Sequence, residues 1–356
     1  MRHVVVLSAL FVIFGALQPA AAAQAPSTLP WSAPATVVVT SEQRRFKNGD
    51  AELAGTLYTP RSQRPVAAVV VTHSASSPLR TASLYDHLET MLPALGMAVF
   101  IYDRRGSGQS GTQDAGGDFA LLADDAIAAA KSLKTDPRID PRRIGIWGLS
   151  QGGWIAPLAA SRSSDIAFAI AVSAPVVTAD VQMIFSSTNH LLANGYSQAD
   201  IEQMMATRKA VDDYTRGTAS REAAQARVDA AKGKPWFKYL YMGETVRDRA
   251  VSGWRKEIEN DPLSNLEAVK VPTLVLYGAD DAVVPVARSV ERLEAIATRL
   301  PDMRVHVVAG ADHAMQVSAD LKASLDPRKD GTERPDSPEY FAVLAGWLAS
   351  QGFTDN

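Results

Sequence analysis

The sequence predicts an α/β fold in which helices cover both faces of a mostly parallel sheet. Short runs that are apolar throughout, such as VAAVVVT at residues 66–72, are typical of strands buried on both faces of a parallel sheet. Stretches with helical apolar spacing alternate with these runs, as expected where parallel strands are joined by helical crossovers. The chain has 356 residues, 46% of them hydrophobic, so it can bury one large core.

The sheet is expected to begin antiparallel. Residues 36–39 and 52–58 are interpreted as two strands on either side of the polar turn at residues 47–50. At least six further strands are then expected to run parallel. These are residues 66–72, 98–102, 144–147, 166–172, 273–277 and 304–308. The helices expected between and after them are residues 82–95, 119–133, 152–160, 286–298 and 338–348.

The first 23 residues have the pattern of an export signal. Arg2 and His3 form a short positive start, residues 4–17 are almost wholly apolar, and residues 19–23 (PAAAA) supply the small side chains that a signal peptidase accepts. About 14 apolar residues are too few for a spanning helix, which needs about 20. We expect residues 1–23 to be a signal peptide and residues 24–35, rich in Pro and Ser, to be a tether. The mature protein is then periplasmic or secreted, with no stable membrane anchor.

Composition narrows the classes of partner. Lys and Arg number 36 against 39 Asp and Glu, for a net charge of −3, and no basic stripe points to nucleic acid. The absence of cysteine excludes thiol nucleophiles, thiolate metal sites and disulfides. The acidic pairs Asp124-Asp125 and Asp212-Asp213 have no histidine or third acid at ligand spacing, so they are interpreted as solvated helix faces. A small-molecule partner is therefore expected, with no cofactor and no metal.

Residues 180–267 interrupt the alternation of strands and helices. They contain no convincing strand and are interpreted as three or four helices, one of which begins at Ser197 with a capping box completed by Asp200. We expect a helical cap over the carboxyl edge of the sheet, between core segments 36–179 and 268–356. Its large side chains either line a pocket or form the cap's own core. They are Met183, Met204, Met205, Trp236, Phe237, Tyr239, Tyr241 and Trp254.

Ser150 lies in the pentapeptide GLSQG at residues 148–152, between an expected strand and an expected helix. In that context G-x-S-x-G predicts a nucleophile elbow, a strained turn that crowds the backbone and so requires small flanking residues. The helix that follows points its dipole and free N–H groups at the place where an oxyanion would form. The alternative is a plain strand-to-helix turn.

A serine nucleophile requires a base, and His313 is the best candidate. It follows the last expected strand in the loop AGADH at residues 309–313, at the same sheet edge as Ser150. Four of the other histidines lie in less suitable places. His3 is in the expected signal peptide, His87 and His190 are in helical stretches, and His306 is inside an expected strand.

The base in turn needs an acid that orients it. Residues 278–285 (GADDAVVP) follow the strand at 273–277, again at its carboxyl end. Either Asp280 or Asp281 could serve, with the other capping the turn. The order Ser, Asp, His along the chain is the order typical of this kind of site.

From about residue 36 to its end, the chain resembles the α/β-hydrolase superfamily. It is most similar to exported esterases and hydrolases near the serine aminopeptidase and dienelactone-hydrolase-like groups. The motifs that carry the resemblance are YDRRGSGQS at 102–110, GLSQG at 148–152, GADDAVVP at 278–285 and GADH at 310–313. In the family's pattern Gly-x-x-Asp-x-x-Val-Pro the acid stands fourth, which implies Asp281 rather than Asp280.

The resemblance also implies an oxyanion hole, with one departure from the family pattern. The family usually has His-Gly-x-Gly after the third strand, whereas residues 73–76 here are His-Ser-Ala-Ser. By position, the backbone N–H groups of Ala75 and Gln151 would hold the oxyanion. The two serines in place of glycines are expected to stiffen the loop, and His73 is expected to orient it.

Residues 103–105 (DRR) are expected to tie loops together beneath the site. The alternative is that Arg104 or Arg105 binds a carboxylate of the substrate.

These expectations combine into an exported serine hydrolase that cleaves carboxylic esters through an acyl-enzyme, with Ser150 as nucleophile, His313 as base and Asp281 as its acid. One alternative is a peptidase or amidase with the same triad, in which acids of the cap hold a free amino terminus. The acids available are Glu202, Asp212, Asp213, Glu257 and Glu259. A binding protein without catalysis is the other alternative.

Overall fold

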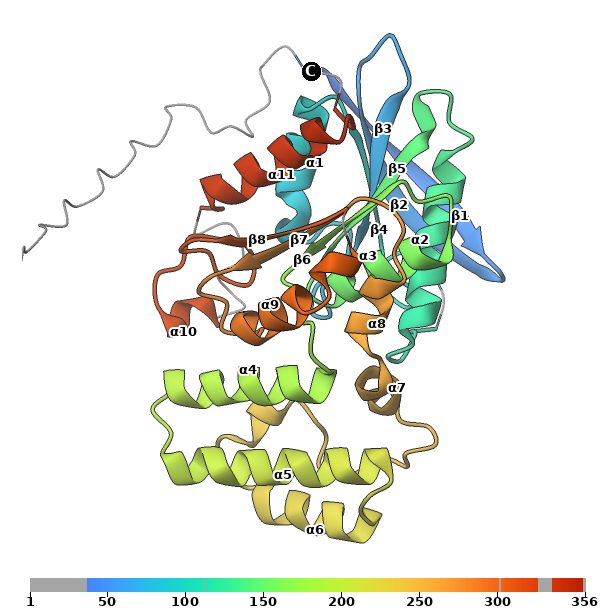
Figure 1. The fold of residues 1–356 in the computed structure, drawn as a ribbon. Helices are drawn as coiled ribbons and strands as arrows, with labels where there is room; N and C mark the ends of the chain where they lie inside the picture. The colour runs from blue at the N-terminus through green and yellow to red at the C-terminus, as the bar shows by residue number, and fades with distance from the viewer. Residues whose placement is uncertain (1–36, 112, 301, 326–334, 355–356) are drawn as a thin grey trace, which may run out of the picture.

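The computed structural model describes residues 37–111, 113–300, 302–325 and 335–354. The expected signal peptide (1–23) and tether (24–35) lie outside the described residues. Eight strands form one sheet in the order β1-β2-β4-β3-β5-β6-β7-β8 (Figure 1). Within the described ranges, no helix is both long enough and apolar enough to span a membrane.

The six expected parallel strands are confirmed. They are β3 (Val66–Thr72), β4 (Ala98–Tyr102), β5 (Ile139–Leu149), β6 (Phe168–Val172), β7 (Thr273–Gly278) and β8 (Met303–Val308). Neighbouring strands from β4 to β8 pair in parallel, and β2 pairs antiparallel with β4. Every residue of β3, β4 and β6 is buried, because helices cover both faces of the sheet.

The opening hairpin differs from the expectation. Strand β1 (Val39–Asn48) begins where the strand expected at 36–39 should have ended, and it pairs with β2 (Ala51–Pro60) around a tight turn at Gly49. Most of β1 is exposed because it is the edge strand, so its residues lack the alternation that marks a half-buried strand. An ion pair of 2.9 Å between Arg45 and Glu52 links β1 to β2 across the hairpin.

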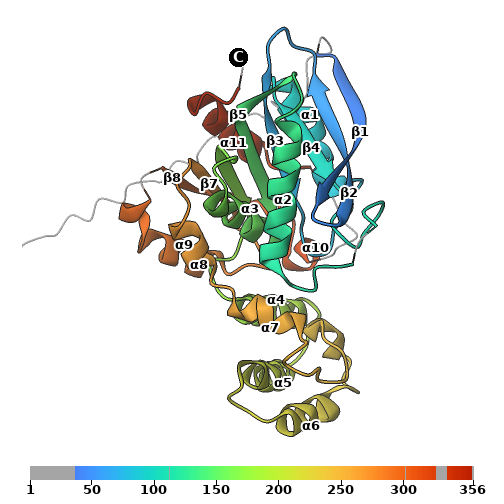
Figure 2. The same cartoon turned by 90° about the vertical axis from the view of Figure 1, so that its right-hand side faces the viewer.

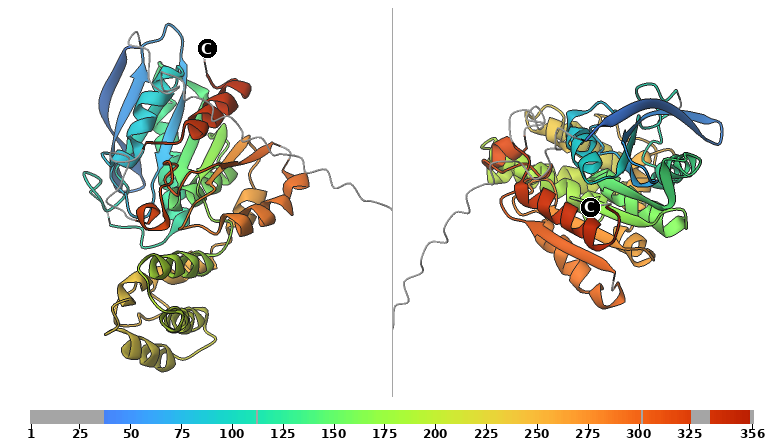
Figure 3. Two further views of the ribbon diagram at one scale, coloured as in Figure 1. Left: turned by 90° about the vertical axis from the view of Figure 1, so that its left-hand side faces the viewer. Right: turned by 90° about the horizontal axis from the view of Figure 1, so that it is seen from above.

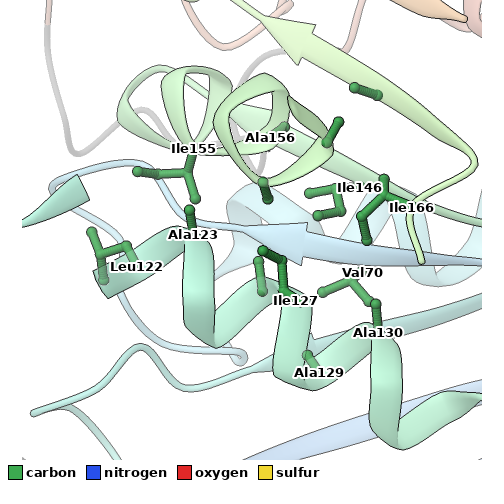
Figure 4. Packing of buried hydrophobic residues seen from close by; sticks show 14 of the residues in the cluster. Val70, Leu122, Ala123, Ile127, Ala129, Ala130, Ile146, Ile155, Ala156 and Ile166 are labelled. Carbon is green, nitrogen blue, oxygen red and sulfur yellow. The ribbon is translucent and has the colours of Figure 1, made fainter. Parts of the chain in front are cut away.

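Successive side chains along each strand point to opposite faces of the sheet and pack into two apolar layers, one on each face. Val69 and Val71 of β3 pack with α1 (Asp86–Ala94) and α11 (Pro338–Ser350) on one face. Val70 faces α2 (Phe119–Leu133) and α3 (Gln151–Arg162) on the other face, where Figure 4 shows Ile127, Ala130 and Ile146 close to it.

Two of the expected helices are shorter than their patterns. The stretch 82–95 divides into a 3₁₀ turn, η1 (Ser83–Tyr85), and α1. The stretch 286–298 ends as α9 (Val286–Glu294), followed by the 3₁₀ turn η3 (Ala297–Arg299). A four-residue helix, α10 (Leu321–Ser324), was not foreseen.

The chain between β6 and β7 is helical. It forms α4 (Ala179–Ala193), α5 (Gln198–Arg216), α6 (Arg221–Ala231), η2 (Phe237–Leu240), α7 (Gly253–Glu259) and α8 (Pro262–Glu267). Figures 2 and 3 show α4 to α6 as a separate layer beyond the carboxyl end of β6. The capping box at Ser197 is confirmed: its side chain accepts the Asp200 N–H at 3.2 Å. Leu266 of α8 packs in the core cluster of α2 and α3 rather than with α4 to α6.

The large side chains of this segment divide between the two roles considered for them. Met204, Trp236 and Phe237 are buried in an apolar cluster that α4 to α6 enclose, and Tyr239 packs against it. Met205 is 40% exposed. The remaining three line a cavity next to the sheet: Met183, Tyr241 and Trp254.

Candidate active site

Ser150 occupies a strained turn between β5 and α3. Its φ of 57° and ψ of −116° are unusual for a residue with a side chain, and such strain is concentrated at functional sites. The glycines around it are required by close approach, because a Cβ atom at Gly148 would lie 2.0 Å from the carbonyl oxygen of Gly152. The turn therefore has the geometry expected of a nucleophile elbow.

Asp281 is paired with His313. The His313 Nδ1–H donates to Asp281 Oδ2 at 2.8 Å, and the Asp281 side chain is fully buried. Its other oxygen, Oδ1, accepts the backbone N–H groups of Val283 (2.7 Å) and Val284 (2.8 Å). Asp280 is exposed, so the geometry selects Asp281 as the acid that faces the histidine.

A tight turn holds His313 in place. Asp312 Oδ1 accepts the N–H groups of Ala314 (2.9 Å) and Gln316 (3.0 Å), and Met315 adopts the left-handed conformation with φ of 64°. The turn lies against the end of β7 at Gly278, where a Cβ atom would be 2.3 Å from the Asp312 carbonyl oxygen. Only glycine allows the strand and the histidine turn to approach this closely.

Replacing Gly278 with alanine should therefore push the histidine turn away from Asp281. We expect the free energy of unfolding to fall by about 1–3 kcal/mol, as is usual for overpacking, and kcat/KM to fall with it. Thermal denaturation measures the first effect, and turnover of the substrates named under the proposed function measures the second. Gly346→Ala is the matched control, because its Cβ atom would meet nothing within 4 Å in α11. Equal behaviour of the two variants would contradict the prediction.

Backbone hydrogen bonds bring the three loops to one sheet edge. Ser150 N–H donates to Val172 at the end of β6, and Ser173 N–H donates to Leu276 of β7, both at 2.8 Å. Ala279 N–H then donates to the last residue of β8 at 2.9 Å. Among the hydrogen bonds of the described residues, none involves the Ser150 hydroxyl. Catalytic hydrogen bonds are often long without substrate.

The surroundings of His313 raise the pKa of its imidazole. Burial by itself lowers the pKa of the imidazole, but the charge of Asp281, the hydrogen bond to its carboxylate and the charge of Asp312 outweigh burial and raise the pKa above its ordinary value. An imidazolium formed during a reaction would be stabilised by the same carboxylates.

Both expected oxyanion donors lie at one cavity. Gln151 is the first residue of α3, where backbone N–H groups have no acceptor within the helix and the helix dipole is positive. Ala75 is exposed in the loop after β3, and both residues line the cavity described below.

His73 supports the loop from behind. It is buried, its Nε2–H donates to the Tyr102 carbonyl, and its ring packs edge-on against Tyr85 and Tyr102. Burial lowers its pKa to about 4, helped by the charge of Arg104, so the imidazole is neutral near pH 7.

The motif at residues 103–105 divides between two roles. Asp103 accepts the backbone N–H (3.0 Å) and a guanidinium N–H (2.7 Å) of Arg80. Arg105 Nε–H donates to the buried Asp125 at 2.7 Å. These two residues tie loops together as expected. Arg104 also lines the cavity, which three consecutive polar residues do not reveal in the sequence.

The interpretation of both acidic pairs as solvated faces was half wrong. Asp125 and Asp212 are buried, because each has a buried arginine as partner: Arg105 for the first and Arg208 for the second. Trp254 Nε1–H also donates to Asp212 at 2.8 Å. Within the described residues, no group of three His, Asp or Glu side chains is placed to hold a metal ion.

A cavity of about 720 Å³ lies between the core and the helices α4, α5 and α7. The core side of its wall includes Ala75, Arg104, Leu122 and Gln151, and the other side includes Met183, Arg208, Tyr241, Trp254 and Glu257. Burial raises the pKa of Glu257 to about 7, although the charges of Arg208 and Arg104 oppose this. The cavity therefore combines apolar side chains, such as Leu122 and Trp254, with two carboxyl groups, those of Asp114 and Glu257.

Of the five acids considered for binding an amino terminus, Glu257 alone lines this cavity. Asp212 is buried against Arg208, and each of the other three bonds to a residue four positions earlier in its helix: Glu202 to Gln198, Asp213 to Lys209 and Glu259 to Arg255. Asp114, which the sequence did not single out, lines the cavity on the core side, and its charge helps raise the pKa of Glu257.

The known proteins that are similar to this chain share one fold, but their names describe different activities. The pattern of the family described as serine aminopeptidase, S33, matches residues 63–318. A thiohydrolase of Arthrinium phaeospermum is 34% identical over 139 residues, which are 38% of this chain and 44% of that protein. A non-heme haloperoxidase of Rhodococcus erythropolis is 26% identical over 270 residues, which are 68% of this chain and 87% of that protein.

Two solved structures show the same fold at low identity. An esterase of Pyrococcus furiosus superposes with a TM-score of 0.55 and 18% identity over 87% of this chain and 91% of that one. A proline iminopeptidase of Mycobacterium smegmatis superposes with a TM-score of 0.51 and 20% identity over 87% and 98%.

Proposed function

The chain belongs to the serine aminopeptidase (S33) family of α/β hydrolases, and on that premise we propose that it cleaves carboxylic esters with Ser150 as nucleophile. The observation that supports this best is the buried Asp281–His313 pair at the sheet edge where Ser150 stands in a strained turn.

The proposed reaction has two steps. The Ser150 oxygen attacks the ester carbonyl carbon while His313 Nε2 takes the hydroxyl proton, and the tetrahedral oxyanion accepts hydrogen bonds from the N–H groups of Gln151 and Ala75. The imidazolium then protonates the leaving alcohol. In the second step His313 activates a water molecule that hydrolyses the acyl-enzyme, and throughout both steps Asp281 holds the imidazole in the required tautomer.

The cavity favours an ester with a small to medium acyl group. Apolar side chains on both sides, among them Leu122, Met183 and Trp254, can accept a hydrocarbon chain next to Gln151. The segment 180–267, which we propose as a cap, would then set the length of the chain that fits.

Matched p-nitrophenyl esters and aminoacyl p-nitroanilides test the proposal directly. We expect faster turnover of the ester, with an optimum at one acyl length, and labelling of Ser150 by a fluorophosphonate probe. Faster turnover of the anilide would contradict the ester assignment. An unlabelled Ser150 together with no turnover of either substrate would favour a binding protein.

An aminopeptidase is the second candidate, because Glu257 and Asp114 line the cavity close enough for their charges to interact. Glu257→Gln separates the two candidates. In an aminopeptidase it should raise KM for substrates with a free amino group while leaving simple esters unchanged. In the esterase we propose, the variant should alter neither substrate selectively.

The pH profile should report His313. The imidazole must be neutral to accept a proton, so kcat/KM should fall as the pH falls through its pKa. Because that pKa is raised, we expect the midpoint of the acid limb above the value of about 6.5 for a free histidine. His73 should not contribute, since its pKa is lowered to about 4. A profile with its midpoint well below 6 would contradict the prediction, and Glu257→Gln shows whether that group contributes.

We also propose export after signal cleavage, from the pattern of residues 1–23. N-terminal sequencing of the protein from a bacterial periplasm or medium should begin at Gln24. Recovery of the intact N-terminus would contradict export with cleavage.

A further inference from the structure

Arg104 joins the two chain segments that carry the expected oxyanion donors. Its Nη1–H donates to the side-chain oxygen of Gln151 at 2.9 Å, and its Nη2–H donates to the carbonyl oxygen of Ala75 at 3.3 Å. The two acceptors come from the first residue of α3 and from the loop after β3. One guanidinium group therefore spans the gap across which an oxyanion would sit.

The loop that contains Ala75 needs such a contact. Ser74 N–H donates to the Tyr85 hydroxyl at 3.0 Å, which fixes the beginning of the loop. Ala75 and Ser76 are exposed, and among the described residues Arg104 is the one side chain that hydrogen-bonds to Ala75. Without Arg104 the turn at Ala75 would be held by two longer hydrogen bonds across it, from Ser77 N–H to the Ser74 carbonyl at 3.3 Å and between the Ser74 and Ser76 hydroxyls at 3.4 Å.

Arg104 is itself well placed to act as a fixed brace. It follows β4 directly, its backbone N–H donates to the Pro78 carbonyl at 2.8 Å, and its side chain is half-buried. The preceding residue, Asp103, holds Arg80 at the far end of the same loop. The two consecutive residues thus fasten the loop at two points, and the planar fork of arginine allows Arg104 to reach two acceptors at once.

We propose that Arg104 is a positioning residue that keeps the Ala75 and Gln151 N–H groups in register for the oxyanion. This inference rests on the proposed function. It predicts that Arg104 acts on the transition state rather than on the bound ester, because the oxyanion is present only in the former. Small displacements of catalytic groups cost up to about 10²-fold, and loss of one oxyanion donor costs about 10²–10³-fold.

The first test is Arg104→Ala on a neutral p-nitrophenyl ester. We expect kcat to fall by about 10- to 100-fold with KM changed by less than about threefold, and affinity for a trifluoromethyl ketone to fall in parallel with kcat/KM. Arg142→Ala is the control for loss of an arginine, because Arg142 is exposed and bonds to Asp140 far from the site. Circular dichroism confirms that each variant is folded.

Two further variants separate position from charge. Arg104→Lys keeps the charge but loses the fork, so it should recover only a minor part of the lost kcat. Gln151→Ala keeps the backbone N–H and removes one acceptor of Arg104. It should lower kcat by less than Arg104→Ala does, because the contact of Arg104 with Ala75 remains, and its effect should not add to that of Arg104→Ala in the double variant, because both changes break the same contact. If Arg104→Ala does not fold, Arg104→Lys and Gln151→Ala still give these readings.

Three outcomes would overturn the inference. Unchanged kcat in Arg104→Ala would do so, as would full recovery in Arg104→Lys, which would indicate charge alone. A raised KM at constant kcat, confined to esters that carry a carboxylate, would make Arg104 a substrate-binding residue instead. These three outcomes bear on Arg104 only when the measured activity depends on Ser150, that is, when Ser150→Ala abolishes it. Activity that survives in Ser150→Ala would overturn the proposed function and this inference together.

Discussion

Ser150→Ala should lower kcat/KM for esters by at least about 10³-fold, as expected for the loss of a triad nucleophile. The change removes the oxygen that would form the acyl-enzyme and leaves the backbone turn, with its φ of 57°, to be adopted by another small residue. The melting temperature should therefore stay close to that of the parent. Steady-state hydrolysis, thermal denaturation and fluorophosphonate labelling measure these three properties.

Ser173 supplies a matched control for this variant. It stands at the end of β6, next to β5 in the sheet, and it also has a positive φ, 48°. Its hydroxyl is buried without a hydrogen-bond partner in the structure, so alanine should not leave a polar group unpaired. Ser173→Ala should keep most of the activity. If Ser150→Ala retained as much activity as Ser173→Ala, Ser150 would not be the nucleophile.

Asp281→Asn should lower kcat/KM by about 10³- to 10⁴-fold with little change in fold, as in other triads that lose the charge of their acid. The asparagine oxygen can still accept the N–H groups of Val283 and Val284, which Asp281 Oδ1 accepts at 2.7 and 2.8 Å. Its amide group would then face His313 Nδ1 and donate to it. The imidazole proton would move to Nε2, and this nitrogen could then no longer accept the proton of Ser150.

Asp280→Asn is the control for Asp281→Asn. The two residues are adjacent and carry the same charge, but Asp280 is exposed whereas the Asp281 side chain is fully buried against His313. We expect Asp280→Asn to change kcat/KM by less than about threefold, in line with the small effects of exposed substitutions. The acid limb of the pH profile should move to lower pH only in Asp281→Asn. Similar losses in both variants would mean that local charge, not the contact with His313, matters.

Much of the sheet was predictable because its signals are local. A strand buried on both faces must be apolar throughout, as residues 66–72 and 98–102 are, and the strands β3, β4, β6 and β7 are buried at every residue. The same rule explains the error at the opening hairpin. Strand β1 is an exposed edge strand, and its pairing with β2 depends on register across the turn rather than on an apolar pattern.

The candidate site was predictable to the extent that motifs mark the ends of strands. The sequence placed Ser150, the acids at 280–281 and His313 at the carboxyl ends of parallel strands, and such ends meet at one sheet edge. It left Asp280 and Asp281 distinguishable only through the resemblance to a family pattern. The structure distinguishes them by burial and by the 2.8 Å bond to His313.

The sequence by itself determined the parallel sheet and the strained serine turn, because each follows from residues close together in the chain. Contacts between distant residues were decided by the tertiary structure alone. Asp125 and Asp212 are buried because the fold brings an arginine to each, and Arg104 reaches Ala75 and Gln151 only after three strands have been placed side by side. The energy of a charged side chain depends on the partner it meets, and no local pattern specifies that partner.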